Sequence, residues 1–82
     1  MPSEMMNEPI EVLAYMFGSK VLPVKFKRAG KVYDIQQVNR SWATPAGKFK
    51  RYYYSVYADG NVYFIYCNQE TLSWTLEKVQ LD

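Results

Sequence analysis

Basic and aromatic side chains are interleaved in the middle of the chain. Lys48, Lys50 and Arg51 directly precede three tyrosines at positions 52–54. Proteins that bind single-stranded nucleic acid use this combination, because bases stack on the rings while the cations meet the phosphates. The sequence therefore predicts a nucleic-acid contact set that also includes an earlier basic run: Lys25, Lys27, Arg28, Lys48, Lys50, Arg51 and Tyr53.

The charge distribution supports this basic middle segment. The net charge of the chain is only +2, but residues 20–51 hold nine basic side chains and a single acidic one, Asp34. The flanking segments 1–19 and 52–82 are each net acidic. A concentrated positive segment favours an anionic partner. The competing interpretation is a solvated face whose lysines prevent edge-to-edge pairing of strands.

A second feature is a hairpin that is aromatic on both faces. Asp59-Gly60 is typical of a tight turn, and it makes residues 49–57 pair with residues 61–68. One interpretation is a central hairpin whose second face is covered by the N-terminal segment. The other is an exposed patch that forms a protein interface or a homodimer contact: Tyr53, Tyr57, Phe64 and Tyr66.

The residue types that catalyse reactions are scarce. The chain has no histidine, and Cys67 is its single cysteine, so neither a histidine base nor a zinc site can be assembled. The four glycines lie in turn-like sequences rather than in a phosphate-binding loop. We therefore predict a protein that is not an enzyme and that uses no cofactor and no metal.

The same composition bears on the compartment. A single cysteine cannot form an intramolecular disulfide, which favours a reducing environment. The acidic N-terminus lacks the features of a signal peptide, and the longest apolar run, at 12–17, is too short to span a bilayer. The sequence predicts a cytoplasmic protein that does not associate with membranes.

Strands must position these side chains. Alternating apolar and polar residues predict strands at 21–27, 32–38, 49–57, 61–68 and 74–81, with turns at 28–31, 44–47 and 59–60 and a bulge at Gln36-Gln37. Residues 9–17 fit either a helix or a strand. The expected fold is mostly β: a five- or six-stranded antiparallel meander, curled into a small sheet or barrel, with one N-terminal helix if residues 9–17 are helical. Residues 1–8 are expected to form a flexible tail, and residues 9–82 a single domain.

The chain contains a characteristic succession of short segments: Pro9–Val12, Pro23–Phe26 with Gly30 and Tyr33, Val38 and Trp42, Arg51–Tyr54, Tyr63–Tyr66, and Trp74–Leu76. Together they resemble a family of small, uncharacterised bacterial β domains. That family occurs alone and with the Y-family-polymerase-like proteins of bacterial damage-induced mutagenesis. The resemblance implies a strand at residues 9–17 and a setting near DNA repair, and it assigns no catalytic or binding residues. The chain departs from the family pattern at Ala29, where an arginine or another polar residue is usual.

Two functions from different classes remain. The basic middle favours a nucleic-acid-binding module, whereas the second aromatic face of the 49–68 hairpin favours a protein-interaction module or a homodimer. We prefer the first because the net charge of residues 20–51 is +8.

Overall fold

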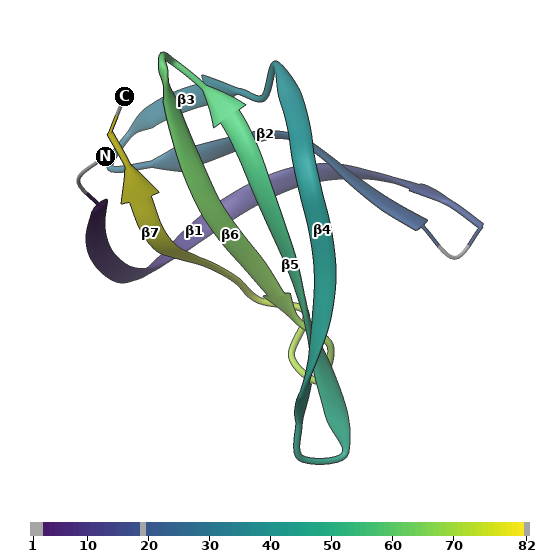
Figure 1. Cartoon of the computed structure of the whole chain (residues 1–82). Helices are drawn as coiled ribbons and strands as arrows, with labels where there is room; N and C mark the ends of the chain where they lie inside the picture. Colours follow the sequence, from purple (N-terminus) through teal and green to yellow (C-terminus); the bar gives the residue numbers. More distant parts are fainter. Residues whose placement is uncertain (1–2, 19, 82) are drawn as a thin grey trace.

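The chain folds into one antiparallel sheet. The computed structural model describes residues 3–18 and 20–81. These residues form seven strands: β1 (Ser3–Phe17), β2 (Lys20–Arg28), β3 (Lys31–Asp34), β4 (Gln37–Ala46), β5 (Phe49–Ala58), β6 (Asn61–Asn68) and β7 (Trp74–Gln80) (Figure 1). The mostly β, antiparallel prediction is confirmed, and residues 9–17 belong to a strand rather than a helix. Among the described residues, no helix is long and apolar enough to cross a membrane.

The first strand begins earlier than the sequence predicted. Residues 3–8, expected to lie in a tail, are part of β1, where Ser3 pairs with Gln80 and Glu4 with Val79. Residues 1–2 of the predicted tail lie outside the described residues. The register of β1 against β7 shifts between Met5 and Glu8, where Asn7 has a positive φ of 48°. Asparagine tolerates that conformation better than most residues, so the irregularity is accommodated within the strand.

Tight turns set the register of the hairpins. Ala29-Gly30 and Asp59-Gly60 each combine two positive φ angles, about 50° and 81°, which defines type I′ turns suited to the twist of the flanking strands. In the first hairpin, Lys27 pairs with Val32, Phe26 with Tyr33 and Lys25 with Asp34, around the turn predicted at residues 28–31. The predicted pairing of residues 49–57 with residues 61–68 is also present, from Tyr57–Val62 to Arg51–Asn68.

The turn predicted at residues 44–47 lies further along the chain. β4 continues through Thr44, Pro45 and Ala46, and the two turn residues are Gly47, with a φ of 68°, and Lys48. Proline tolerates this place because β4 is an edge strand, so its missing N–H need not break a ladder. Pro45 is therefore compatible with a strand here, although the same residue usually indicates a turn.

The strand order is β3-β2-β1-β7-β6-β5-β4, so the first and last strands of the chain pair in the middle of the sheet. The predicted 32–38 strand is interrupted at Ile35-Gln36, next to the expected bulge. There the Ile35 N–H donates to the Val24 carbonyl and the Gln36 N–H donates to the Tyr57 carbonyl. The chain thus leaves β2 and joins β5 at one end of the curled sheet. At the other end the β1–β2 and β4–β5 hairpins splay apart as two arms (Figure 1).

The core occupies the concave side of the curl. Val56, Ile65 and Leu76, from β5, β6 and β7, have no exposed surface, and Phe26 of β2 is 1% exposed. The Phe26 ring stacks on Tyr33 at 4.8 Å between centroids. Burying each such side chain stabilises the fold by about 2 kcal/mol. This core fixes which faces of the strands remain available for binding.

Candidate nucleic-acid interface

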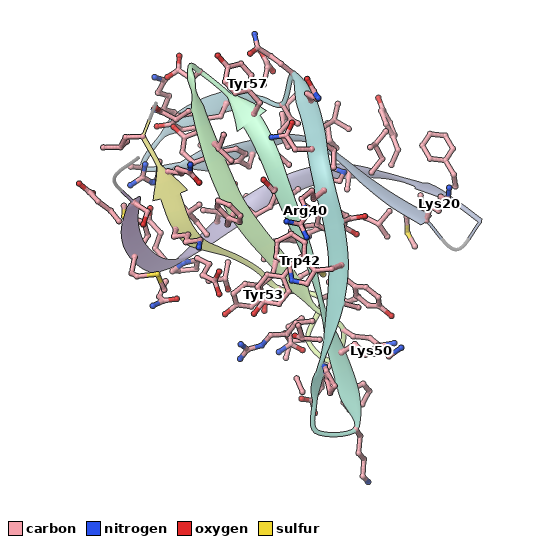
Figure 2. The ribbon with its side chains drawn as sticks, viewed as in Figure 1. Lys20, Arg40, Trp42, Lys50, Tyr53 and Tyr57 are labelled. Atoms are coloured by element: carbon pink, nitrogen blue, oxygen red, sulfur yellow. The ribbon has the colours of Figure 1, made fainter. Side chains whose placement is uncertain are left out.

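The convex side of β4–β7 carries a row of rings and cations, which we call the outer aromatic face. Its members are Arg40, Trp42, Arg51, Tyr53, Phe64, Tyr66 and Lys78. The strand registers place Trp42 beside Tyr53 and Tyr53 beside Tyr66. Because side chains alternate between faces along a strand, residues two apart continue the same face. Figure 2 shows Arg40, Trp42 and Tyr53 close together on the sheet.

The rings of this face cover one another. The Trp42 and Tyr53 rings are parallel within 4°, with centroids 5.4 Å apart, and Tyr66 follows at 5.0 Å from Tyr53. Phe64 meets Trp42 edge-on at 6.4 Å. Tyr53 is consequently only 8% exposed, while its three neighbours are half-buried. Accessible ring surface is therefore offered by Trp42, Phe64 and Tyr66 rather than by Tyr53.

Neither sequence interpretation of this face describes it fully. The N-terminal segment does not cover it, because β1 lies within the sheet between β2 and β7. The face is also not a fully exposed platform, since its rings shield Tyr53. Trp42, from the neighbouring strand β4, completes the row that the 49–68 hairpin begins.

A cation lies over each of the three half-buried rings. The Lys78 Nζ atom is 4.5 Å from the centroid of Phe64, and Arg51 Cζ is 4.8 Å from that of Tyr66. Arg40 Cζ is 5.6 Å from the centroid of Trp42. The interaction with Tyr53 is the main cause that raises the pKa of Arg51, while the buried Nε atom of this side chain has no hydrogen-bond partner. Such contacts orient a cation while leaving its N–H groups available to a ligand.

Two basic residues of the first hairpin, Arg28 and Lys31, are neutralised by ion pairs instead. Arg28 forms an ion pair with Glu8, and the Lys31 ammonium lies 2.8 Å from the Asp59 carboxylate. Lys25 and Lys27 lie opposite Asp34 and Glu11, respectively, in the strand register, although no ion pair joins them among the described residues. Across residues 3–18 and 20–81, in contrast, no ion pair involves a cation of the outer aromatic face.

The structure thus divides the predicted contact set. Lys25, Lys27 and Arg28 lie on β2, which β1 separates from β7, the first strand of the outer aromatic face in the sheet order. Arg51 and Tyr53 belong to that face, whereas Lys50, adjacent to Arg51 in a strand, points to the opposite side. Lys48 lies in the turn between β4 and β5.

The predicted interface set is divided in the same way. Tyr53, Phe64 and Tyr66 lie together, but among the described residues no ring contact joins Tyr57 to them. Tyr57 lies towards the turn end of β5, away from Trp42 (Figure 2).

Three members of the face were missed from the sequence: Arg40, Trp42 and Lys78. The alternation Arg40, Trp42, Thr44 on one strand carried a signal for the first two. Using it required the pairing of β4 with β5, which the displaced turn concealed. Lys78 reaches the face because β7 pairs with β6, where it lies opposite Phe64.

Other chemistry finds little support in the geometry. Within the described ranges, no three side chains of the His, Cys, Asp or Glu type are grouped to hold a metal ion. Burial raises the pKa of the Cys67 thiol, which disfavours the reactive thiolate. Comparisons with protein-family models, with curated proteins and with solved structures gave no match. The arrangement of the side chains is therefore the basis for a functional proposal.

Proposed function

We propose that this protein is a non-catalytic module that binds single-stranded nucleic acid on its outer aromatic face. The observation that carries the proposal is the set of three cations, Arg40, Arg51 and Lys78, each over a ring and without an ion pair among the described residues. A sheet face that offers rings to bases and free cations to phosphates suits a flexible single strand better than a rigid duplex.

Each part of the face has a role in this proposal. Trp42 ends the ring row because β4 is the edge strand, so a base that stacks on it extends the row Tyr66, Tyr53, Trp42. Arg40 would contact the phosphate next to that base. Arg51 and Lys78, over Tyr66 and Phe64, would contact phosphates further along the strand.

The resemblance to the bacterial β domains supports the same proposal. That resemblance implies a setting near DNA repair. We accordingly propose a bacterial, cytoplasmic setting near DNA repair.

The protein-interface alternative has less support from the geometry. Its central residue, Tyr53, is buried by neighbouring rings, and Tyr57 lies apart from the cluster. A homodimer through these side chains would also bring two sets of unpaired cations together, which is unfavourable.

The test is fluorescence anisotropy with labelled single-stranded DNA, single-stranded RNA and duplex DNA at 20 nucleotides, titrated over a range of salt. If three phosphates are neutralised, the logarithm of the affinity for a single strand should fall with the logarithm of the salt concentration with a slope of about −2. We expect both single strands to bind more tightly than the duplex.

A matched pair of double variants locates the site. Arg40→Gln with Arg51→Gln removes two cations from the outer aromatic face and should reduce the slope to about −0.7. Lys25→Gln with Lys27→Gln removes the same charge from β2 and should leave the slope unchanged. Equal effects of the two double variants, or no binding by the wild-type protein at low salt, would refute the proposal.

A further inference from the structure

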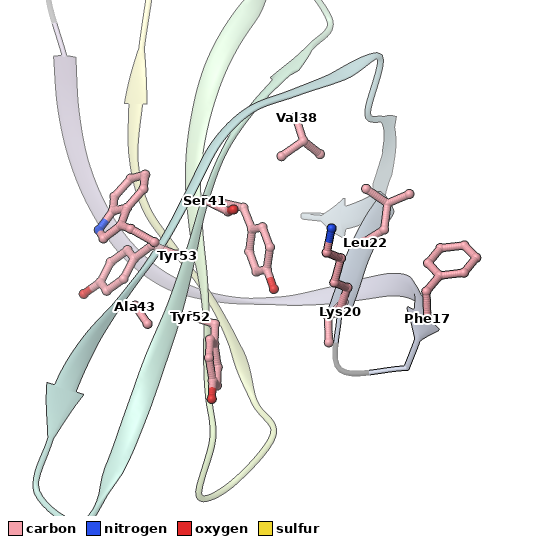
Figure 3. Close-up of a pocket in the computed structure, with 11 residues that line it drawn as sticks. Phe17, Lys20, Leu22, Val38, Ser41, Ala43, Tyr52 and Tyr53 are labelled. Atoms are coloured by element: carbon pink, nitrogen blue, oxygen red, sulfur yellow. The ribbon is translucent and has the colours of Figure 1, made fainter.

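A cavity of about 500 Å³ lies between the two splayed arms of the sheet, and we call it the cleft (Figure 3). Val21 and Leu22 of β2 line one side, and Ser41, Trp42 and Ala43 of β4 line the other. Consecutive residues of a strand point to opposite faces of a sheet. Because consecutive residues from both strands line the same cavity, the cleft lies at two strand edges rather than on one face.

The two edges are left without partners by the path of the chain. β2 pairs with β3 only over Lys25–Arg28, since the chain turns away to β5 at Ile35-Gln36. Residues 20–23 of β2 therefore have a strand neighbour on the β1 side alone. β4 is the last strand of the sheet, so it pairs only with β5.

The edge of β4 presents backbone groups to the cleft. In an antiparallel pair, residues alternate between exchanging both hydrogen bonds with the partner and facing away from it. Counted from the two-residue turn Gly47-Lys48, the β4 residues whose backbone N–H and C=O groups face away from β5 are Pro45, Ala43 and Ser41. Proline has no N–H, but the N–H and C=O groups of Ala43 and Ser41 can pair with an added strand.

The walls of the cleft are apolar and open to solvent. Phe17 is 60% exposed, Leu22 43% and Tyr52 36%. A second cavity of about 240 Å³ shares Val21, Tyr52 and Tyr54 with the cleft and continues towards Met16 and Leu72. Exposed apolar side chains in this number, grouped around one cavity, mark an interaction site.

Lys20 gives the cleft its charge. Among the described residues it is the one charged side chain that lines this cavity, and Figure 3 places its amine in the opening between the two arms. Lys50, opposite Pro45 in the register, adds a second cation on the same side of β5 as Tyr52. An acidic side chain in the occupant would therefore be favoured, and a second copy of this chain would not, because its own edge strand β4 has no acidic residue and adds another cation, Arg40.

We infer that the cleft binds an extended acidic segment of another protein, which adds a strand to the free edge of β4. Alternate side chains of this segment pack against Val21, Leu22 and Tyr52, and a carboxylate meets Lys20. Main-chain hydrogen bonds give such complexes their affinity, while the pockets for alternate side chains give their specificity. The cleft shares Trp42 and Tyr53 with the outer aromatic face. Peptide binding uses the backbone edge of β4 and Lys20, however, whereas nucleic-acid binding uses the rings and cations of the convex side.

The test is selection of random eight-residue peptides displayed on phage against the whole protein. We expect enrichment of peptides in which apolar residues alternate with others and which carry at least one Asp or Glu. The most enriched peptide, synthesised with a fluorescent label, should protect the backbone amides of Ser41 and Ala43 from hydrogen exchange.

Two variants then test the backbone and the charge. Ala43→Pro removes an outward N–H without removing a donor to β5, and it should weaken peptide binding roughly tenfold. Lys20→Glu should weaken binding of the acidic peptide several-fold, and a peptide with lysine in place of the acidic residue should recover it. Arg51→Gln, on the convex side, is the matched control and should leave peptide binding unchanged.

Several results would overturn the inference. Selection without enrichment of alternating acidic peptides would do so, as would peptide binding that is indifferent to Lys20→Glu in a variant shown to be folded by circular dichroism. A dimer in sedimentation experiments that Ala43→Pro dissociates would assign the cleft to a second copy of the chain instead.

Discussion

Two basic regions of similar composition have different electrostatic surroundings. On β2 and β3, Arg28 and Lys31 are paired with Glu8 and Asp59, which come from distant parts of the chain. On the outer aromatic face, Arg40, Arg51 and Lys78 lie over rings instead of beside carboxylates. The comparison teaches that local charge density alone does not identify a binding surface, because the partners of each cation decide whether its charge remains available.

The largest expected effect comes from removing the terminal ring of the row. Trp42→Ala should lower affinity for single-stranded nucleic acid roughly 10- to 100-fold, since stacking of one base contributes about 1–3 kcal/mol. Val32→Ala removes an exposed apolar side chain from the first hairpin and serves as the control. Anisotropy titrations measure the affinity of both variants. Similar losses of affinity would contradict the distinction between the outer aromatic face and the first hairpin.

Removing one cation of the outer aromatic face should have a smaller effect, on the salt dependence of nucleic-acid binding. Lys78→Gln should reduce the steepness of the salt dependence by about 0.7, the contribution of one phosphate contact to a single strand. Lys27→Gln should not change it, because Lys27 lies beside Glu11. Titrations at four or more salt concentrations measure the difference. A change caused by Lys27→Gln as large as that caused by Lys78→Gln would argue against distinct regions.

A double variant tests whether acidic neighbours account for the difference between the two basic regions. Glu11→Gln with Asp34→Asn removes the acidic neighbours of Lys27 and Lys25 and should turn the first hairpin into a second weak anion site. We expect affinity at low salt to rise roughly threefold, equally for single strands and duplex, because the added attraction is electrostatic and does not depend on sequence. Unchanged affinity would show that these carboxylates do not screen the lysines.

The smallest effect concerns folding. Glu8→Gln removes the ion pair with Arg28, whose side chain is 22% exposed, and should lower the free energy of unfolding by less than about 1 kcal/mol. Urea denaturation followed by tyrosine and tryptophan fluorescence measures this change. A decrease of several kcal/mol in the free energy of unfolding would mean that the ion pair is needed to hold β1 against β2.

Local patterns in the sequence predicted the two hairpins, with turns at residues 28–31 and 59–60. Asp59-Gly60 and Ala29-Gly30 specify short turns, and the alternation of residues then determines which side chains share a face. The turn after β4 was misplaced because Pro45 favours both a turn and an edge strand, and the neighbours of a strand cannot be read from its own residues. The same limitation hid Arg40 and Trp42 from the candidate site.

The amino-acid sequence by itself determined that this chain forms antiparallel strands with an aromatic, basic middle and no histidine-based chemistry. Only the tertiary structure decided which basic residues are neutralised, since Glu8 and Arg28, or Lys31 and Asp59, meet through pairings between strands far apart in the sequence. The tertiary structure alone also created the cleft. The curl of the sheet and the switch of the chain from β2 to β5 leave two edges facing each other, and this depends on long-range packing that no local pattern encodes.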